Sequence, residues 1–176
     1  TAVMGLNSCN LNSRNLKITI LHTNDVHSQI EPFPTNHNQY PNKGGFARRA
    51  DLINETINLN PNTLIFDAGD IFQGTPYFNF FQGDLELSLM KKMGYNAATI
   101  GNHEFDAGLK KLKQNIINND FQFISSNYDF TNTELEGLID KYKIYNKGGV
   151  KIGVFGLGIE LKGLVNPLLF QETKYY

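Results

Sequence analysis

Two stretches of the sequence decide the fold: residues 63–70 read TLIFDAGD, and residues 97–104 read AATIGNHE. In each, a short apolar run typical of a buried strand is followed at once by polar residues and glycine, which predicts a strand that ends in a loop. Residues 16–28, LKITILHTNDVHS, show the same pattern earlier in the chain, with a strand expected over 16–21. Because helical segments separate these strands, the alternation predicts βαβ units and a largely parallel sheet.

Helices and further strands are predicted around these stretches. Apolar positions 46, 50, 53 and 57 mark one face of a helix that follows Gly44-Gly45. Gly94 is the expected C-terminal cap of another helix, and Gly148-Gly149 is the expected turn between two strands. The remaining predictions are a loop over 31–43, helices over about 84–93 and 109–116, and strands over 97–100, 121–124, 141–145 and 150–155.

Composition and charge restrict the classes of function open to this chain. The 176 residues are 40% hydrophobic, which suits one domain or a piece of one. They carry 16 Lys and Arg against 17 Asp and Glu, spread without a basic block, so a nucleic-acid groove or a membrane-surface patch has no electrostatic support. No apolar run approaches the roughly 20 residues of a membrane helix, so we expect a chain that is soluble or anchored only at an end.

The single cysteine, Cys9, allows no internal disulfide. The stretch Leu6-Asn7-Ser8-Cys9 resembles a bacterial lipoprotein processing box, in which the cysteine becomes the lipidated first residue. Residues 10–15 are polar and suit a tether, so residues 1–16 are interpreted as a signal remnant and linker. This predicts a lipid anchor at Cys9 and a place on the periplasmic side of the cell envelope. A plain free cysteine, and with it a cytoplasmic location, is the alternative.

Polar side chains with metal-binding atoms follow three successive strands: Asp25 and His27, then Asp70, then Asn102 with His103. The carboxyl ends of parallel strands share one edge of a sheet and lie about 5 Å apart, so these side chains can converge on one small volume. Two metal ions about 3.5–4 Å apart need a shared anionic ligand, and Asp70 at the middle strand is the natural candidate. Carboxylate, imidazole and amide ligands suit Mn²⁺, Zn²⁺ or Fe²⁺ better than a metal that prefers thiolate.

These motifs also resemble those of a known family. Asp25-Val26-His27, Gly69-Asp70 and the stretch 101–104 (GNHE) are similar to the first three signature blocks of the calcineurin-like metallophosphoesterases. Residues 21–27 (LHTNDVH), 44–48 (GGFAR) and 102–106 (NHEFD) narrow the resemblance to the bacterial 5′-nucleotidase and UDP-sugar hydrolase branch. The similarity runs from about residue 17 to residue 158, which is most of the chain.

The resemblance implies a fold and a reaction. The fold would be α/β, an α-β-β-α sandwich built from βαβ units. The site would hold two divalent ions, Mn, Zn, Fe or Co, on Asp25, His27, Asp70 and Asn102. A metal-bound water would hydrolyse a small phosphorylated substrate, a 5′-nucleotide or a nucleotide sugar, in nucleotide catabolism. His103 would stabilise charge or protonate the leaving oxygen, and Asp106 would orient it; Asn102 and His103 would contact the substrate phosphate.

The metal-ligand set departs from the family pattern in one respect. The family completes its metal site with further histidines from later strands, whereas His103 is the last histidine here. Residues 17–176 are therefore interpreted as the first half to two-thirds of the catalytic domain, without its last strands and without a nucleoside-binding C-terminal domain. We expect residues 1–176 alone to have no appreciable phosphatase activity.

Other interpretations stay open at this point. The same ligand blocks serve cyclic nucleotides, sugar phosphates and sulfur-containing ester analogues, and a non-catalytic module that binds a metal or a partner is a further alternative. The aromatic residues at 77, 78, 80 and 81 are expected to be core or lid. His22 and His37 are assigned no role, and the oligomeric state is not predicted.

Overall fold

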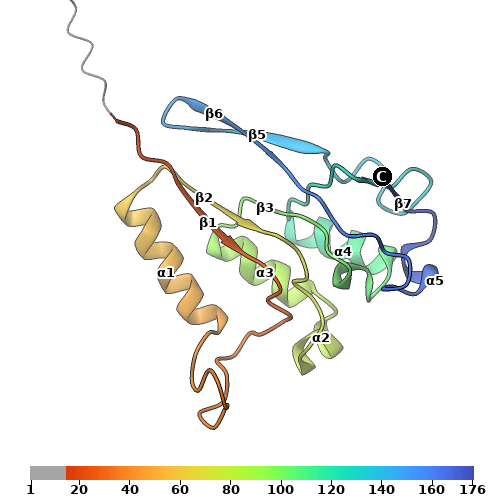
Figure 1. Ribbon diagram of the computed structural model, residues 1–176, viewed down its shortest axis with the longest axis horizontal. Helices are drawn as coiled ribbons and strands as arrows, with labels where there is room; N and C mark the ends of the chain where they lie inside the picture. The colour runs from red at the N-terminus through yellow and green to blue at the C-terminus, as the bar shows by residue number, and fades with distance from the viewer. Residues whose placement is uncertain (1–14) are drawn as a thin grey trace, which may run out of the picture.

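The centre of the fold is a parallel sheet of three strands in the order β1-β2-β3 (Figure 1). The computed structural model describes residues 15–176, so Cys9 and its neighbours lie outside the described residues. The strands are β1 (Thr19–Thr23), β2 (Thr63–Asp67) and β3 (Ala97–Ala98). The expected α/β class with a parallel sheet is confirmed, and β2 is the middle strand.

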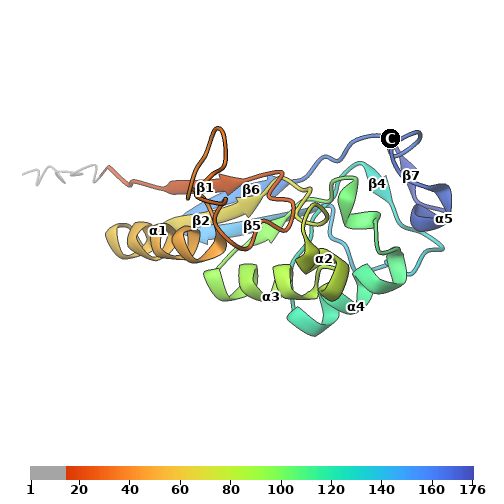
Figure 2. The ribbon, with the colours of Figure 1, turned by 90° about the horizontal axis from the view of Figure 1, so that it is seen from below.

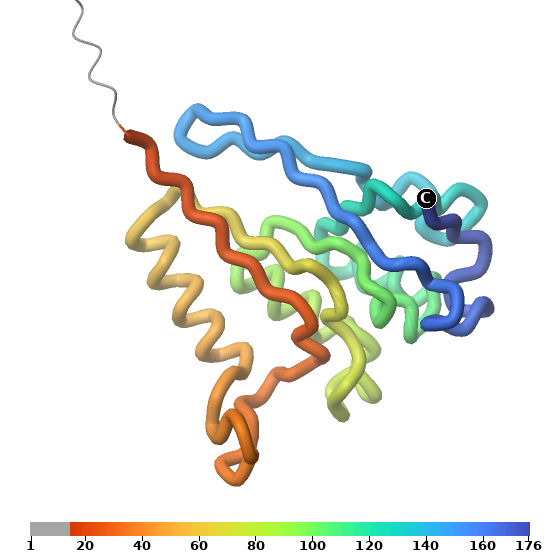
Figure 3. Tube along the Cα trace, in the orientation of Figure 1, coloured from red at the N-terminus to blue at the C-terminus, as the bar shows by residue number. Residues whose placement is uncertain are grey.

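The register of the sheet brings the strand ends together. β1 and β2 pair over five residues each, from Thr19 opposite Thr63 to Thr23 opposite Asp67. The two residues of β3 pair with the last two residues of β2: Phe66 lies opposite Ala97 and Asp67 opposite Ala98. The three loops that follow therefore leave the sheet at one edge, and the Cα trace in Figure 3 shows them side by side.

Three helices cover one face of this sheet (Figure 2). They are α1 (Phe46–Leu59), α3 (Asp84–Met93) and α4 (Leu109–Asn119), and of the stripe predicted in α1 Phe46 and Ile53 are buried while Ala50 and Ile57 are half-buried. α3 ends at Gly94 in the left-handed conformation, with a φ of 87°, so the predicted cap is confirmed. On the opposite face, Ile20 of β1 remains 55% exposed.

The rest of the chain forms short elements beside the sheet. β5 (Tyr142–Lys147) and β6 (Val150–Phe155) form an antiparallel hairpin, which confirms the predicted turn at residues 148–149. β4 (Tyr128–Asp129) pairs with β7 (Lys174–Tyr175). The remaining elements are α2 (Pro76–Phe81), the 3-10 helix η1 (His103–Phe105) and α5 (Pro167–Phe170).

The first strand, expected over 16–21, runs from Thr19 to Thr23, and two other predicted strands are absent or cut short. The expected strand over 121–124 is wrong: Phe123 and Ile124 form only isolated bridges, to Ala98 and Asp140. The chain pairs there with two different partners in succession, so no continuous ladder develops. The strand expected over 97–100 shortens to residues 97–98, because β2 ends opposite it and the next residues turn into the site loop.

The aromatic segment expected as core or lid forms the short helix α2. Pro76 opens it, and the Phe78 ring stacks on the buried Phe72 ring at a centroid distance of 5.8 Å. Phe80 points outward and is 81% exposed. The segment is therefore anchored by one aromatic residue and presents another to solvent.

Candidate metal centre

The loop after β1 is joined to the loop after β2 by main-chain hydrogen bonds. The N–H groups of the first loop donate to carbonyl oxygens of the second at 2.8–3.1 Å, so the pairing of β1 with β2 continues past the ends of the strands. We call this contact the backbone junction. Its three bonds run from Asp25 to Gly69, from His27 to Asp70 and from Ser28 to Ile71.

The residues of this junction adopt an uncommon backbone conformation. Asp25, His27, Ser28 and Asp70 have φ values between 44° and 57°, in the left-handed region that side chains other than glycine seldom occupy. Such strain persists only where the surroundings enforce it, and it is frequent at functional sites. Three of the four residues are predicted metal ligands.

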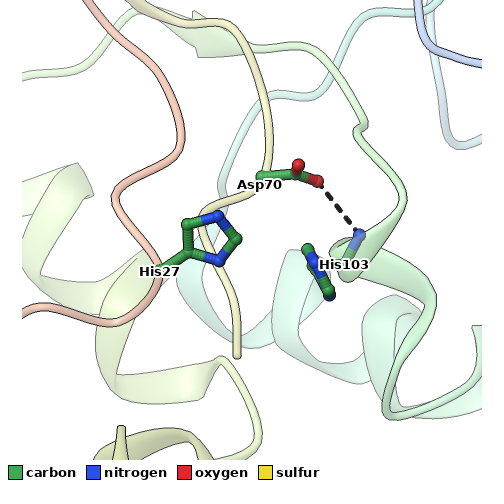
Figure 4. A group of neighbouring side chains, drawn as sticks. All are labelled: His27, Asp70 and His103. Atoms are coloured by element: carbon green, nitrogen blue, oxygen red, sulfur yellow. Dashed lines mark hydrogen bonds between the residues drawn. The ribbon is translucent and has the colours of Figure 1, made fainter. Parts of the chain in front are cut away.

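Imidazole and carboxylate groups from all three loops meet at this edge of the sheet. One ligand atom each from His27, Asp70 and His103 lies within 4.8 Å of the others, and Figure 4 shows the three side chains coming from separate segments. The two imidazole rings meet edge to face, with centroids 5.0 Å apart. Asp25 extends the group, because its Oδ1 lies 3.8 Å from Nε2 of His27.

Beside this group is a pocket of about 430 Å³. Asp25, Asp70 and Asn102 all line it, and Tyr175 and Gly158 from late in the chain close its other side. The structure thus brings the four predicted ligands to one place, three in the pocket wall and His27 in contact range of Asp25. It also brings in His103, which the sequence analysis assigned to catalysis and not to metal binding.

His103 is held from both sides. Its Nδ1 lies 2.8 Å from Oδ2 of Asp106, the partner expected to orient it. Its main-chain N–H donates to Oδ1 of Asp70 at 3.1 Å. Because Nδ1 is engaged, Nε2 is the ring nitrogen left for a ligand, an ion or a proton transfer.

Glu104 is a residue of the site to which the sequence analysis gave no role. Its carboxylate is fully buried and accepts N–H groups from Asp70, Ile71 and Gly101 at 3.0, 2.7 and 2.6 Å. Burial raises the pKa of Glu104 to about 7, and the three hydrogen bonds oppose that rise. The residue stands in the stretch 101–104, but the sequence carries no sign that its side chain turns inward.

A second buried carboxyl, Asp67, supports the same edge. It accepts the Thr23 hydroxyl at 2.5 Å and the Gly69 N–H at 2.9 Å, so it fixes the start of the loop that carries Asp70. Burial raises its pKa to about 6, against the lowering effect of the Thr23 hydrogen bond. The Tyr95 hydroxyl lies 2.8 Å from that of Thr23 and extends the network into the core.

The loops after β2 and β3 approach so closely that both need glycine. A Cβ on Gly101 would lie 2.3 Å from Oδ1 of Asp70, and a Cβ on Gly69 would lie 2.7 Å from the Gly101 nitrogen. Real side chains do not reach these distances, so the contact requires bare backbone at both positions.

The donor set fits divalent metal ions. Ligand bonds of about 2.0–2.3 Å to nitrogen and oxygen place the ligand atoms around one ion about 3–4.5 Å apart, and the observed separations of up to 4.8 Å need only small side-chain movements. Imidazole with carboxylate is the chemistry that Mn²⁺, Fe²⁺, Co²⁺ and Zn²⁺ share.

Comparison with known proteins agrees with this geometry. The family model described as calcineurin-like phosphoesterase matches residues 18–172. The snake venom 5′-nucleotidase of Gloydius brevicauda is 38% identical over 166 residues, 90% of this chain and 28% of that relative. Two solved structures also cover 90% of the chain. The 5′-nucleotidase precursor from Thermus thermophilus has a TM-score of 0.79 and 33% identity, and the NAD nucleotidase of Haemophilus influenzae has 0.73 and 31%.

The chain therefore belongs to the calcineurin-like phosphoesterase family, as its motifs indicated. Its relatives include 5′-nucleotidases. The chain spans about 30% of the length of these relatives, 28% of the venom enzyme and 32% of the Thermus thermophilus chain.

Proposed function

We propose that this chain forms part of a metal-dependent phosphoesterase that hydrolyses nucleotides or nucleotide-containing esters at a site for two divalent ions. The observation that carries the proposal is the meeting of His27, Asp70 and His103 beside a pocket that Asp25 and Asn102 also line. Two imidazoles and two carboxylates converge at the carboxyl edge of a parallel sheet, which is where open α/β folds place their functional sites.

In this proposal Asp25, His27, Asp70 and Asn102 would hold the ions, with Asp70 as the shared ligand because its loop follows the middle strand, β2. The chemistry supplied by divalent ions, when bound, is activation of water and neutralisation of phosphate charge. Asn102 offers its amide to a phosphate oxygen from the wall of the pocket.

His103 is proposed to protonate the leaving oxygen or to stabilise charge on the phosphate. Its Nδ1 is held by Asp106, so Nε2 is free to carry the proton. Asp106 would fix the tautomer and orientation of the ring, since a carboxylate beside Nδ1 accepts the proton of that nitrogen.

A nucleotide is the proposed substrate class because the relatives are named for it. The venom and Thermus thermophilus proteins are 5′-nucleotidases, and the Haemophilus influenzae protein is a NAD nucleotidase. Because the last of these is named for NAD, the proposed substrates also include nucleotide-containing diesters such as nucleotide sugars.

The test is metal removal from the full-length protein. Chelation should abolish hydrolysis of both AMP and p-nitrophenyl phosphate, and added Mn²⁺ or Co²⁺ should restore it, because in this proposal the ions supply the activated water and most of the charge neutralisation. Hydrolysis that persists in excess chelator would exclude this proposal and indicate a covalent mechanism.

We also infer a location in the cell envelope, with Cys9 as the point of lipid attachment. The support is the processing-box resemblance at residues 6–9. No helix within residues 15–176 is long and apolar enough to cross a membrane. In a bacterial host the full-length protein should partition into the detergent phase, and Cys9→Ser should move it to the aqueous phase; equal partitioning of both would refute the anchor.

A further inference from the structure

The loop after β2 meets the loop after β3 in a different way from the backbone junction. Within residues 15–176, no main-chain hydrogen bond joins residues 69–71 to residues 100–104. The two loops nevertheless touch, because Gly69 and Gly101 pack backbone to backbone. Some other group must fix their separation.

Two side chains supply such groups: the Asp70 carboxylate accepts the His103 N–H, and the carboxylate of Glu104 accepts three N–H groups from the two loops. One oxygen, Oε1, accepts the Ile71 N–H, while Oε2 accepts both the Asp70 N–H and the Gly101 N–H. The Glu104 side chain therefore ties the loop that carries Asp70 to the loop that carries Asn102 and His103. We call this contact the carboxylate junction.

The chemistry of the junction requires a carboxylate. Three N–H donors converge on the two oxygens of a fully buried carboxylate, which would be costly to leave without these partners. A glutamine would turn an NH₂ group toward at least one of these donors. An aspartate would carry the right group but fall one methylene short.

We propose that Glu104 is a positioning residue that sets the separation between Asp70 and the Asn102–His103 pair, so that the ligand geometry exists before any ion binds. The proposal rests on the proposed metal site and deepens it. It predicts that the carboxylate junction governs metal affinity, as groups that orient ligands commonly do.

The experiment compares Glu104→Gln with a matched control in the full-length protein. Glu86 is the control, because it is equally buried and, within residues 15–176, its carboxyl lies beside Ser28 of the loop after β1 and makes no hydrogen bond to the loops after β2 or β3. Amide hydrogen exchange of the metal-free proteins would be followed in peptides covering residues 68–72 and 99–105, and Mn²⁺ binding by electron paramagnetic resonance titration.

For Glu104→Gln we expect exchange in both peptides to accelerate at least about tenfold and the Kd for Mn²⁺ to rise about 10–100-fold. Glu86→Gln should leave both quantities near those of the wild type. If Glu104→Gln does not fold, Glu104→Asp, which keeps the charge and loses the reach, takes its place with the same expected changes.

Three results would overturn the inference. Unchanged Mn²⁺ affinity in the variant would show that Glu104 has at most a structural role, whatever the exchange rates. An equal loss of affinity in Glu86→Gln would show a general effect of altering the core. A wild-type protein that binds no Mn²⁺ would instead refute the proposed metal site itself, and with it this role for Glu104.

Discussion

The two junctions at the edge of the sheet hold their loops in different ways. The backbone junction uses main-chain N–H and carbonyl groups of residues 25–28 and 69–71, so it needs no particular side chain. The carboxylate junction depends on one side chain, Glu104, and on two glycines that allow close approach. Changes to the side chains of Asp25, His27 and Ser28 should therefore leave the hydrogen bonds of the backbone junction possible, whereas a change to Glu104 should break the carboxylate junction.

Asp70→Ala should have the largest effect, because it removes the carboxylate that is the proposed shared ligand, whereas the main-chain groups of residue 70 remain in both junctions. The Asp70 carbonyl accepts from His27, its N–H donates to Glu104, and its Oδ1 accepts from His103. In the full-length protein, Asp70→Ala should lose bound metal and activity together, since the proposed shared ligand is gone. Metal content by elemental analysis and AMP hydrolysis measure the two effects.

His103→Ala, in contrast, should lower kcat by about 10²–10⁴-fold while metal content stays near normal. The same two assays separate it from Asp70→Ala. Equal metal loss in both variants would show that His103 is a ligand, a role that its position in the three-residue group also permits.

Glycine substitutions test the close contact at the carboxylate junction. Gly69 and Gly149 both have positive φ, 96° and 84°, but only Gly69 is crowded, whereas a Cβ on Gly149 meets nothing within 4 Å. Gly149→Ala should lower the free energy of unfolding by about 1 kcal/mol, from backbone strain alone. Gly69→Ala should cost roughly 3 kcal/mol, because the loops must also separate.

Urea unfolding of the two alanine variants measures this difference. Equal losses of unfolding free energy in the two variants would mean that the contact between Gly69 and Gly101 adapts easily. The carboxylate junction would then be less rigid than described.

Asp67 supplies a prediction about the dependence of stability on pH. Burial raises its pKa from 3.8 to about 6, so between these values the folded protein holds a proton that the unfolded chain has lost. Stability from this group is therefore present below about pH 4 and falls as pH rises through 6, by at most about 3 kcal/mol. In the Asp67→Asn variant residue 67 cannot ionise, so this fall in stability with rising pH should be absent.

The measurement is urea unfolding of the metal-free wild type and Asp67→Asn from pH 4 to pH 7. The stability of the wild type relative to the variant should decline across that range. A constant difference would show that Asp67 keeps its ordinary pKa.

Much of the fold and of the site could be predicted from the sequence, because the signals are local. The run TLIFDAGD carries its strand and its ligand in consecutive residues, and the stripe beginning at Phe46 shows its helical face directly. The parallel arrangement then places the ligands at one edge. Even the middle position of Asp70 followed from the order of the strands.

The remainder depends on contacts between distant segments. Glu104 bonds to Asp70 across 34 positions, and nothing near Glu104 in the sequence distinguishes it from an exposed glutamate. The strand expected over 121–124 was wrong for a similar reason, since Phe123 and Ile124 pair with different partners. The roles assigned to the individual ligands and to His103 stay predictions.

The most direct test of the account is a crystal structure of the full-length protein grown with Mn²⁺, using anomalous scattering to locate the ion. The account predicts anomalous density at the edge of the sheet, with a carboxylate oxygen of Asp70 and an imidazole nitrogen of His27 about 2.0–2.3 Å from it. Full occupancy of Mn²⁺ at another place, with Asp70 and His27 bound to no ion, would contradict it.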